Sequence, residues 1–159
     1  MRKTLADRVA EAIASGGYSG YFPIFPGTVG SVVGIALYLV LVRFGLLSDG
    51  FSAAWPVVLG AILAVGTVSA HRCEKMFGHD NRRIVIDEIW GMLIAVFMLP
   101  TRWPWILSGF LIFRFLDIVK PFPARRAERL GGGFAIMLDD GVAGGYTALI
   151  LHLIKLITR

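Results

Sequence analysis

Charged residues are scarce in this sequence of 159 residues: they make up 17% of it, whereas 56% of the residues are hydrophobic. A soluble domain typically has about 25% charged and about 45–50% apolar residues. The composition therefore excludes an ordinary water-soluble domain and a disordered chain. The single cysteine excludes a disulfide framework and a multi-thiolate metal site. The net charge of +5 does not indicate nucleic acid as a partner, because basic residues in so apolar a chain are expected in the cytoplasmic loops of a membrane protein.

The signatures of several phosphatase chemistries are also absent. Cys73 is not followed six residues later by an arginine, as the cysteine-phosphatase loop requires. The sequence has no Asp-x-Asp aspartyl-phosphate motif, no Pro-Ser-Gly-His stretch and no Walker-type loop. These absences argue against a serine or cysteine nucleophile in a known motif.

Hydrophobic runs divide the chain into segments that predict an all-α fold, a polytopic membrane helical bundle forming one domain over residues 1–159. Apolar residues at helical spacing between Leu5 and Ile13 predict a short amphipathic helix that lies on the membrane, packs on the core or faces solvent. Thr28 is a candidate N-cap for the first hydrophobic helix. The third and fourth segments are short for spanning helices. The five predicted hydrophobic segments are Thr28–Leu47, Gly50–Ala70, Ile84–Leu99, Trp105–Val119 and Ala135–Ile157.

Basic residues are concentrated in two of the predicted loops, which orients the chain. The first and third loops contain one basic residue each, Arg43 and Arg102. Because cytoplasmic loops carry an excess of Lys and Arg, five crossings with the N-terminus inside place both basic loops in the cytoplasm. Lys155 and Arg159 then lie outside, which counts weakly against this topology. The basic loops contain Arg72, Lys75, Arg82 and Arg83 in the second, and Lys120, Arg125, Arg126 and Arg129 in the fourth.

Six of the 11 acidic residues are expected to approach this cytoplasmic interface. Burying carboxylates near hydrocarbon is costly unless they are paired or bind a metal. Hard oxygen ligands without clustered Cys or His favour Mg²⁺ over Mn²⁺ or Ca²⁺. The alternative is that the acids form structural pairs with Arg114, Lys120 and Arg125. The six are Asp80, Asp87, Glu88, Asp117, Asp139 and Asp140.

Cations near these acids suit a bound phosphate. Arg114, Asp117 and Lys120 are spaced three apart and share one helical stripe. A guanidinium or ammonium beside an acidic metal site can bind phosphate oxygens together with the metal. The first N–H groups of the helix at residues 27–30 could also bind an anion.

Several motifs, in order along the chain, resemble the bacterial phosphatidylglycerophosphatase A family. The resemblance covers about Ser19 to Tyr146, most of the chain. It is carried by Pro26-Gly27-Thr28-Val29-Gly30-Ser31, His79-Asp80, Ile84-Val85-Ile86-Asp87-Glu88-Ile89-Trp90-Gly91-Met92, Phe113-Arg114-Phe115-Leu116-Asp117-Ile118-Val119-Lys120-Pro121-Phe122-Pro123 and Gly132-Gly133-Phe134-Ala135-Ile136-Met137-Leu138-Asp139-Asp140-Gly141-Val142-Ala143-Gly144.

This resemblance implies a Mg²⁺-dependent enzyme of the bacterial inner membrane that hydrolyses phosphatidylglycerophosphate to phosphatidylglycerol and inorganic phosphate. We expect a direct water attack, with a covalent intermediate on a carboxylate nucleophile as the alternative. Asp80 is a candidate further ligand or general base, and His79 a candidate proton donor to the leaving group. The expected metal ligands are Asp87, Glu88, Asp117, Asp139 and Asp140, with catalytic roles also for Asp87 and Lys120; the expected phosphate or substrate contacts are Thr28, Arg114, Lys120 and Arg125.

Two rival functions belong to other classes. A CDP-alcohol phosphotransferase would match Ala124-Arg125, but the Asp pattern required after that pair is missing. A divalent-cation carrier would require acids near mid-membrane on facing segments, whereas the acids here are predicted at one end of the bundle.

Overall fold

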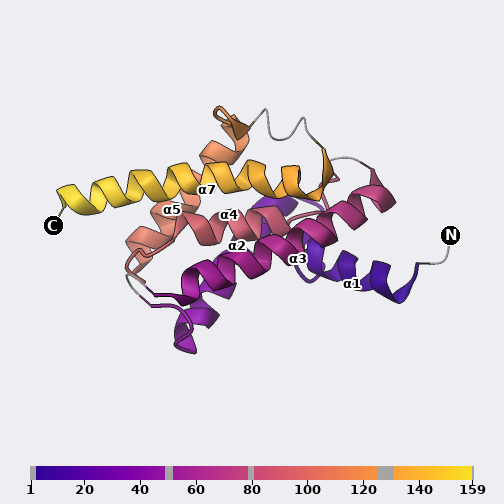
Figure 1. Cartoon of the computed structure of the whole chain (residues 1–159). Helices are drawn as coiled ribbons and strands as arrows, with labels where there is room; N and C mark the ends of the chain where they lie inside the picture. The colour runs from indigo at the N-terminus through magenta and orange to yellow at the C-terminus, as the bar shows by residue number, and fades with distance from the viewer. Residues whose placement is uncertain (1–2, 49–51, 79–80, 125–130, 159) are drawn as a thin grey trace.

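The computed structural model describes residues 3–48, 52–78, 81–124 and 131–158, and every regular element in these ranges is a helix (Figure 1). The predicted all-α bundle of four to five hydrophobic helices with an additional N-terminal helix is confirmed. The elements are α1 (Leu5–Ala14), the short 3₁₀ helix η1 (Ser19–Tyr21), α2 (Pro26–Arg43), α3 (Ala54–Phe77), α4 (Ile86–Ala95), α5 (Trp103–Val119) and α7 (Gly132–Ile157).

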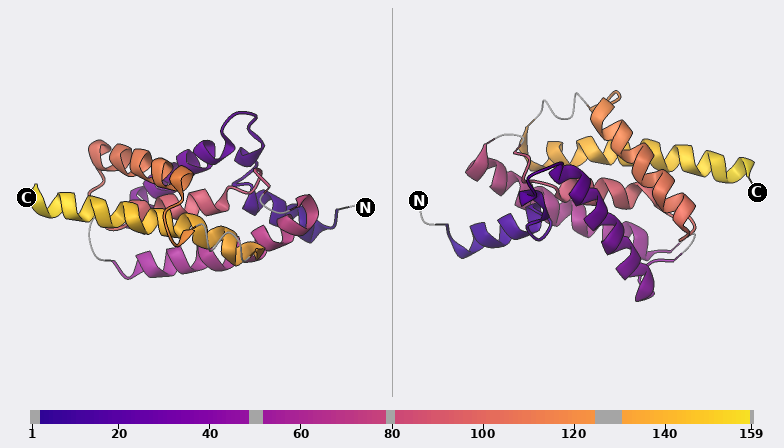
Figure 2. Two further views of the ribbon diagram at one scale, coloured as in Figure 1. Left: turned by 90° about the horizontal axis from the view of Figure 1, so that it is seen from above. Right: turned by 180° about the vertical axis from the view of Figure 1, so that it is seen from behind.

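The shortest hydrophobic helix, α4, lies at the centre of the bundle. It packs against α2, α3, α5 and α7, which surround it in the two views of Figure 2. Seven of its ten residues are buried. Helix α4 is apolar on nearly all sides, apart from its first turn, as expected of a helix enclosed by others.

One end of the bundle, which we call the polar end, contains the starts of α2, α4 and α7 and the ends of α3 and α5. Gly30 of α2 lies against Val85, and Gly34, one turn later, lies against Ile89 and Met92 of α4, so these two helices run in the same direction. Gly133, at the start of α7, lies against the backbone of α3 at Thr67 and His71. The acidic residues at these helix ends are therefore brought to the same end of the bundle, as the predicted topology requires.

In the described part of the chain, three helices, α2, α3 and α7, are long and apolar enough to cross a membrane. Helix α4 has 10 residues and extends about 15 Å at 1.5 Å per residue, half of the roughly 30 Å hydrocarbon core. After α4 the chain continues away from the polar end. There the Thr101 hydroxyl lies 2.7 Å from the hydroxyl of Tyr38, which is near the other end of α2. The protein is thus a membrane protein, and the five-crossing topology stays a prediction.

Several predicted helix boundaries were wrong: α2 ends at Arg43 rather than Leu47, and α4 ends at Ala95 rather than Leu99. Thr28 is not an N-cap: α2 begins at Pro26, whose fixed φ suits the first helical position, after Phe25 in a left-handed conformation. Helix α3 does not end at Ala70 but continues to Phe77. The polar extension remains helical because Ala70 and Cys73 are buried against Ala10 and Ala14 of α1.

Helix α1 packs along this extension of α3, so the alternative of a wholly solvent-facing helix was wrong. Arg72 donates a hydrogen bond to the Asp7 carboxylate over 2.8 Å, which lowers the pKa of Asp7 to about 2. Lys3 pairs with Glu11 over 2.7 Å. The side of α1 that carries Leu5 and Val9 is apolar, and these two side chains are 79% and 49% exposed. Contact of that side with a membrane remains a prediction.

The adjacent glycines Gly144 and Gly145 of α7 provide a test of the packing between α4 and α7. A methyl group on Gly144 would lie 3.0 Å from Ile94 Cβ and would meet the backbone of Gly91, whereas a methyl group on Gly145 would have no atom within 4 Å. We expect Gly144→Ala to lower the free energy of unfolding by about 1–3 kcal/mol. We expect Gly145→Ala to be neutral or stabilising, because alanine favours the helix over glycine. Thermal unfolding of both variants in one detergent measures the difference, and equal midpoints would contradict the close approach.

Candidate active site

A polar cavity of about 240 Å³ opens at the polar end of the bundle. Its wall combines the segment before α4 with the start of α4, the end of α5 and the first turns of α7. Among the described residues, five acidic side chains and two basic ones face this one small volume, so electrostatics dominates the cavity. The lining residues are Asn81, Arg82, Ile84, Asp87, Glu88, Asp117, Lys120, Ile136, Asp139 and Asp140.

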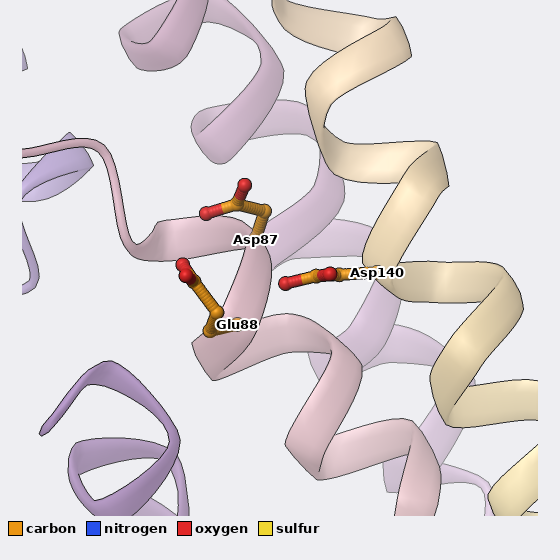
Figure 3. Close-up of side chains that lie close together, drawn as sticks. All are labelled: Asp87, Glu88 and Asp140. Carbon is orange, nitrogen blue, oxygen red and sulfur yellow. The ribbon is translucent and has the colours of Figure 1, made fainter. Parts of the chain in front are cut away.

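Three carboxylates form the core of the site, which we call the carboxylate cluster: Asp87, Glu88 and Asp140. One oxygen from each lies within 4.8 Å of those from the other two. Figure 3 shows Asp87 and Glu88 at the start of α4 and Asp140 directed from α7 toward them. Each residue has a buried side-chain oxygen without a hydrogen-bond partner among the described residues, namely Asp87 Oδ1, Glu88 Oε2 and Asp140 Oδ2. Unpartnered buried oxygens of like charge are costly, so the arrangement suits a cation bound among them.

The other two predicted ligands, Asp117 and Asp139, are held in ion pairs beside the cluster. Arg114 Nη1 lies 2.5 Å from Asp117 Oδ2, one helical turn away on α5. Lys120 donates a hydrogen bond to Asp139 Oδ2 over 2.6 Å. Lys120 ends α5 in a left-handed conformation with φ 50°. The alternative of structural pairing thus describes Asp117 and Asp139, and their role as metal ligands stays a prediction.

The start of α2 also approaches the carboxylate cluster, at Glu88. A Cβ on Gly27 would overlap Glu88 Oε1 and lie 3.3 Å from Arg114 Nη1, so only glycine fits without displacing them. No side chain caps this helix start. The first turn of α2 therefore brings backbone N–H groups and the positive end of a helix dipole near Glu88. Thr28 lies in this turn, but neither Thr28 nor Arg114 is part of the cavity wall.

Three predicted site residues, His79, Asp80 and Arg125, lie outside the described residues. The structure adds four wall residues that the sequence did not suggest: Asn81, Arg82, Ile84 and Ile136. Arg82 had been assigned only to the charge bias that orients the chain. The sequence did contain a signal for Arg82, because it stands shortly before the Asp87-Glu88 pair. A basic residue so close in sequence to two acids is a candidate member of the same site.

The neighbouring residues Asp139 and Asp140 allow a test of the electrostatics. In metal-free buffer with EDTA, we expect Asp140→Asn to raise the free energy of unfolding by about 1–2 kcal/mol, because it removes one of three mutually repelling carboxylates. Asp139→Asn should lower it by about 1 kcal/mol, because the ion pair between Asp139 and Lys120 is lost. Chemical or thermal unfolding in one detergent compares the two. A destabilised Asp140→Asn variant would contradict an uncompensated cluster.

Comparison with known proteins agrees with this geometry. The chain is 41% identical over 145 residues to a phosphatidylglycerophosphatase A of Escherichia coli K12, covering 89% of this chain and 81% of that protein. It is 37% identical over 146 residues to one of Haemophilus influenzae, covering 90% and 86%. It is also 37% identical over 146 residues to a Bacteroides thetaiotaomicron protein with the provisional name phosphatidylinositol-3-phosphatase, covering 87% and 89%. No solved structure matches the chain.

The resemblance found in the motifs is therefore confirmed. A model of the family described as phosphatidylglycerophosphatase A matches residues 12–155, which include α2 to α5, all of α7 except its last two residues, and the whole carboxylate cluster. The chain belongs to the phosphatidylglycerophosphatase A family.

Proposed function

We propose that this protein hydrolyses the terminal phosphomonoester of phosphatidylglycerophosphate, releasing phosphatidylglycerol and inorganic phosphate. The observation that carries the proposal is the set of three unpartnered carboxylate oxygens in the polar cavity of a chain of this family. The two relatives named phosphatidylglycerophosphatase A support the substrate.

The carboxylate cluster fits a Mg²⁺ ion by the chemistry of its donors. Mg²⁺ is bound in proteins mainly by a few carboxylates together with waters and substrate phosphates, and Asp87, Glu88 and Asp140 offer only carboxylate oxygens. Asp117 and Asp139 are close enough to line the same cavity and would complete the set as further ligands. Bound there, the ion would neutralise phosphate oxygens and lower the pKa of a water molecule.

The protein's own groups would orient the phosphate and move the protons. Lys120, which lines the cavity and is held by Asp139, would stabilise negative charge on the phosphate oxygens in the transition state, and Arg114 would hold Asp117 in place. In the reaction, a water oxygen bonds to phosphorus as the bond to the glycerol oxygen breaks. Asp80 would accept the proton from the water, and His79 would donate one to the leaving oxygen.

We further propose that the enzyme lies in the bacterial inner membrane with the cavity facing the cytoplasm. The polar end of the bundle contains Arg72 and Lys75 at the end of α3 and Arg82 and Arg83 before α4. This excess of basic residues is typical of the cytoplasmic side. A cavity at one end of the bundle also suits a lipid whose headgroup lies at the membrane surface.

The alternatives make different products. A CDP-alcohol phosphotransferase would release CMP from CDP-diacylglycerol, and a cation carrier would release no phosphate. The acids of the cluster lie at one end of the bundle, which does not suit a path across the membrane. The provisional name of the Bacteroides relative adds phosphatidylinositol 3-phosphate as a substrate to assay beside phosphatidylglycerophosphate.

Replacing Asp87 tests the role of the carboxylate cluster. We expect Asp87→Asn to reduce kcat for phosphate release from phosphatidylglycerophosphate by a factor of at least about 10², with the protein still folded in detergent. Mg²⁺ should raise the unfolding midpoint of the unaltered protein, as any ligand of the native state does, and should not raise that of the variant.

A control for this experiment is Asp7→Asn, which removes an acid of α1 that is not part of the cavity wall and should retain activity. EDTA should stop phosphate release by the unaltered protein. Full activity of Asp87→Asn would remove Asp87 from the site. Phosphate release that is unaffected by EDTA would refute the metal.

A further inference from the structure

Two adjacent arginines before α4 have different environments. Arg82 lines the polar cavity, whereas the Arg83 guanidinium lies over the rings of Tyr21 and Phe77, at 5.0 Å and 5.4 Å from their centroids. Both arginines lie in a turn that Asn81 stabilises. The Asn81 side-chain oxygen accepts a hydrogen bond from the Arg83 backbone N–H over 3.2 Å, and the Asn81 carbonyl accepts one from the Ile84 backbone N–H over 2.8 Å. The turn thereby directs Arg82 to the cavity and Arg83 to the aromatic side.

Arg82 differs from the other basic residues near the cavity in its charge partners. Lys120 pairs with Asp139 and Arg114 with Asp117. Within the part of the chain that the structure describes, Arg82 has no ion pair. Its guanidinium is therefore available for a ligand anion, and its planar donors match the oxygens of a phosphate.

Depth in the cavity separates Arg82 from the carboxylate cluster. Asp140 is 3% exposed and Asp139 8% exposed, while Arg82 is exposed. The acids therefore form the deep part of the cavity and Arg82 its mouth. A ligand with its terminal phosphate at the cluster would extend past Arg82 on the way out.

The proposed substrate has a second phosphate in this position. Its terminal phosphomonoester is joined through glycerol to a phosphodiester, which carries one negative charge and leads to the acyl chains. We propose that Arg82 binds this phosphodiester and so selects lipid headgroups that have a diester as well as a monoester. This inference rests on the proposed function, because it assumes that the monoester is bound at the carboxylate cluster.

The experiment measures inhibition by the two products separately. Phosphatidylglycerol contains the diester without the monoester, and inorganic phosphate resembles the monoester alone. In neutral detergent micelles with Mg²⁺, we expect Arg82→Gln to raise the Ki of phosphatidylglycerol and the KM of phosphatidylglycerophosphate about tenfold, which corresponds to about 1.4 kcal/mol. The Ki of inorganic phosphate should change less than about twofold, because removing one charge-assisted contact affects only the group that it touches.

Lys75→Gln is the matched control. Lys75 is exposed on the same end of the bundle but does not line the cavity, so this variant loses the same charge and should keep both inhibition constants. Arg82→Lys retains the charge without the planar donors and should fall between Arg82→Gln and the unaltered protein. Equal effects of Lys75→Gln and Arg82→Gln would overturn the proposal in favour of general surface charge.

Two further outcomes would overturn the proposal: an equal rise in the Ki of inorganic phosphate, and an unchanged Ki for phosphatidylglycerol. Failure of the proposed function is recognised separately, since the unaltered protein would then release no phosphate from phosphatidylglycerophosphate. In that case, direct binding of phosphatidylglycerol micelles to the unaltered protein and to Arg82→Gln decides the question. Loss of binding only in Arg82→Gln supports the diester contact, and equal binding refutes it.

Discussion

The close crossing of α4 and α7 is the contact on which the site depends. At Gly91, the space that a side chain would fill is occupied by the Asp140 carbonyl and the ring of Phe113, each 2.7 Å from the position of a Cβ. Gly144 faces the same glycine from α7, one helical turn after Asp140. Because the two backbones approach so closely, Asp140 lies beside the first turn of α4 and its carboxylate joins those of Asp87 and Glu88. Bulkier residues at this crossing would separate the carboxylates.

The convergence of the acids could be predicted from the sequence, but their division into two groups could not. The positions of Asp87, Asp117 and Asp139 at the ends of apolar segments indicated one common end. The three-residue spacing of Arg114 and Asp117 indicated their ion pair, which the structure contains. Adjacent helical residues point about 100° apart, and in α7 this leaves Asp139 paired with Lys120 while Asp140 joins the carboxylate cluster. Which one meets Lys120 is decided by the rotation of α7 in the bundle, and no local pattern encodes that rotation.

Helix boundaries failed to follow from the sequence for a similar reason. A change from apolar to polar residues after Ala70 was interpreted as the end of α3, since a spanning segment normally ends there. The helix continues because Cys73, on the same face as Ala70, is buried under α1. The partner of this face is more than fifty residues away in sequence. Likewise Pro26 allowed a helix to begin two residues before Thr28, although threonine was the better capping residue.

Helix dipoles reduce part of the electrostatic cost of the carboxylate cluster. Asp87 and Glu88 lie in the first turn of α4, and the uncapped start of α2 approaches Glu88 at Gly27. A negative charge at a helix N-terminus gains about 0.3–1 kcal/mol, which is less than the cost of an unpartnered buried charge, about 1–3 kcal/mol or more. The same helix starts attract a phosphate, but the carboxylates repel it. A cation bound by the carboxylates would remove the electrostatic cost of the cluster and also its repulsion of phosphate, because it compensates the negative charge. The site would then bind an anion instead of repelling it.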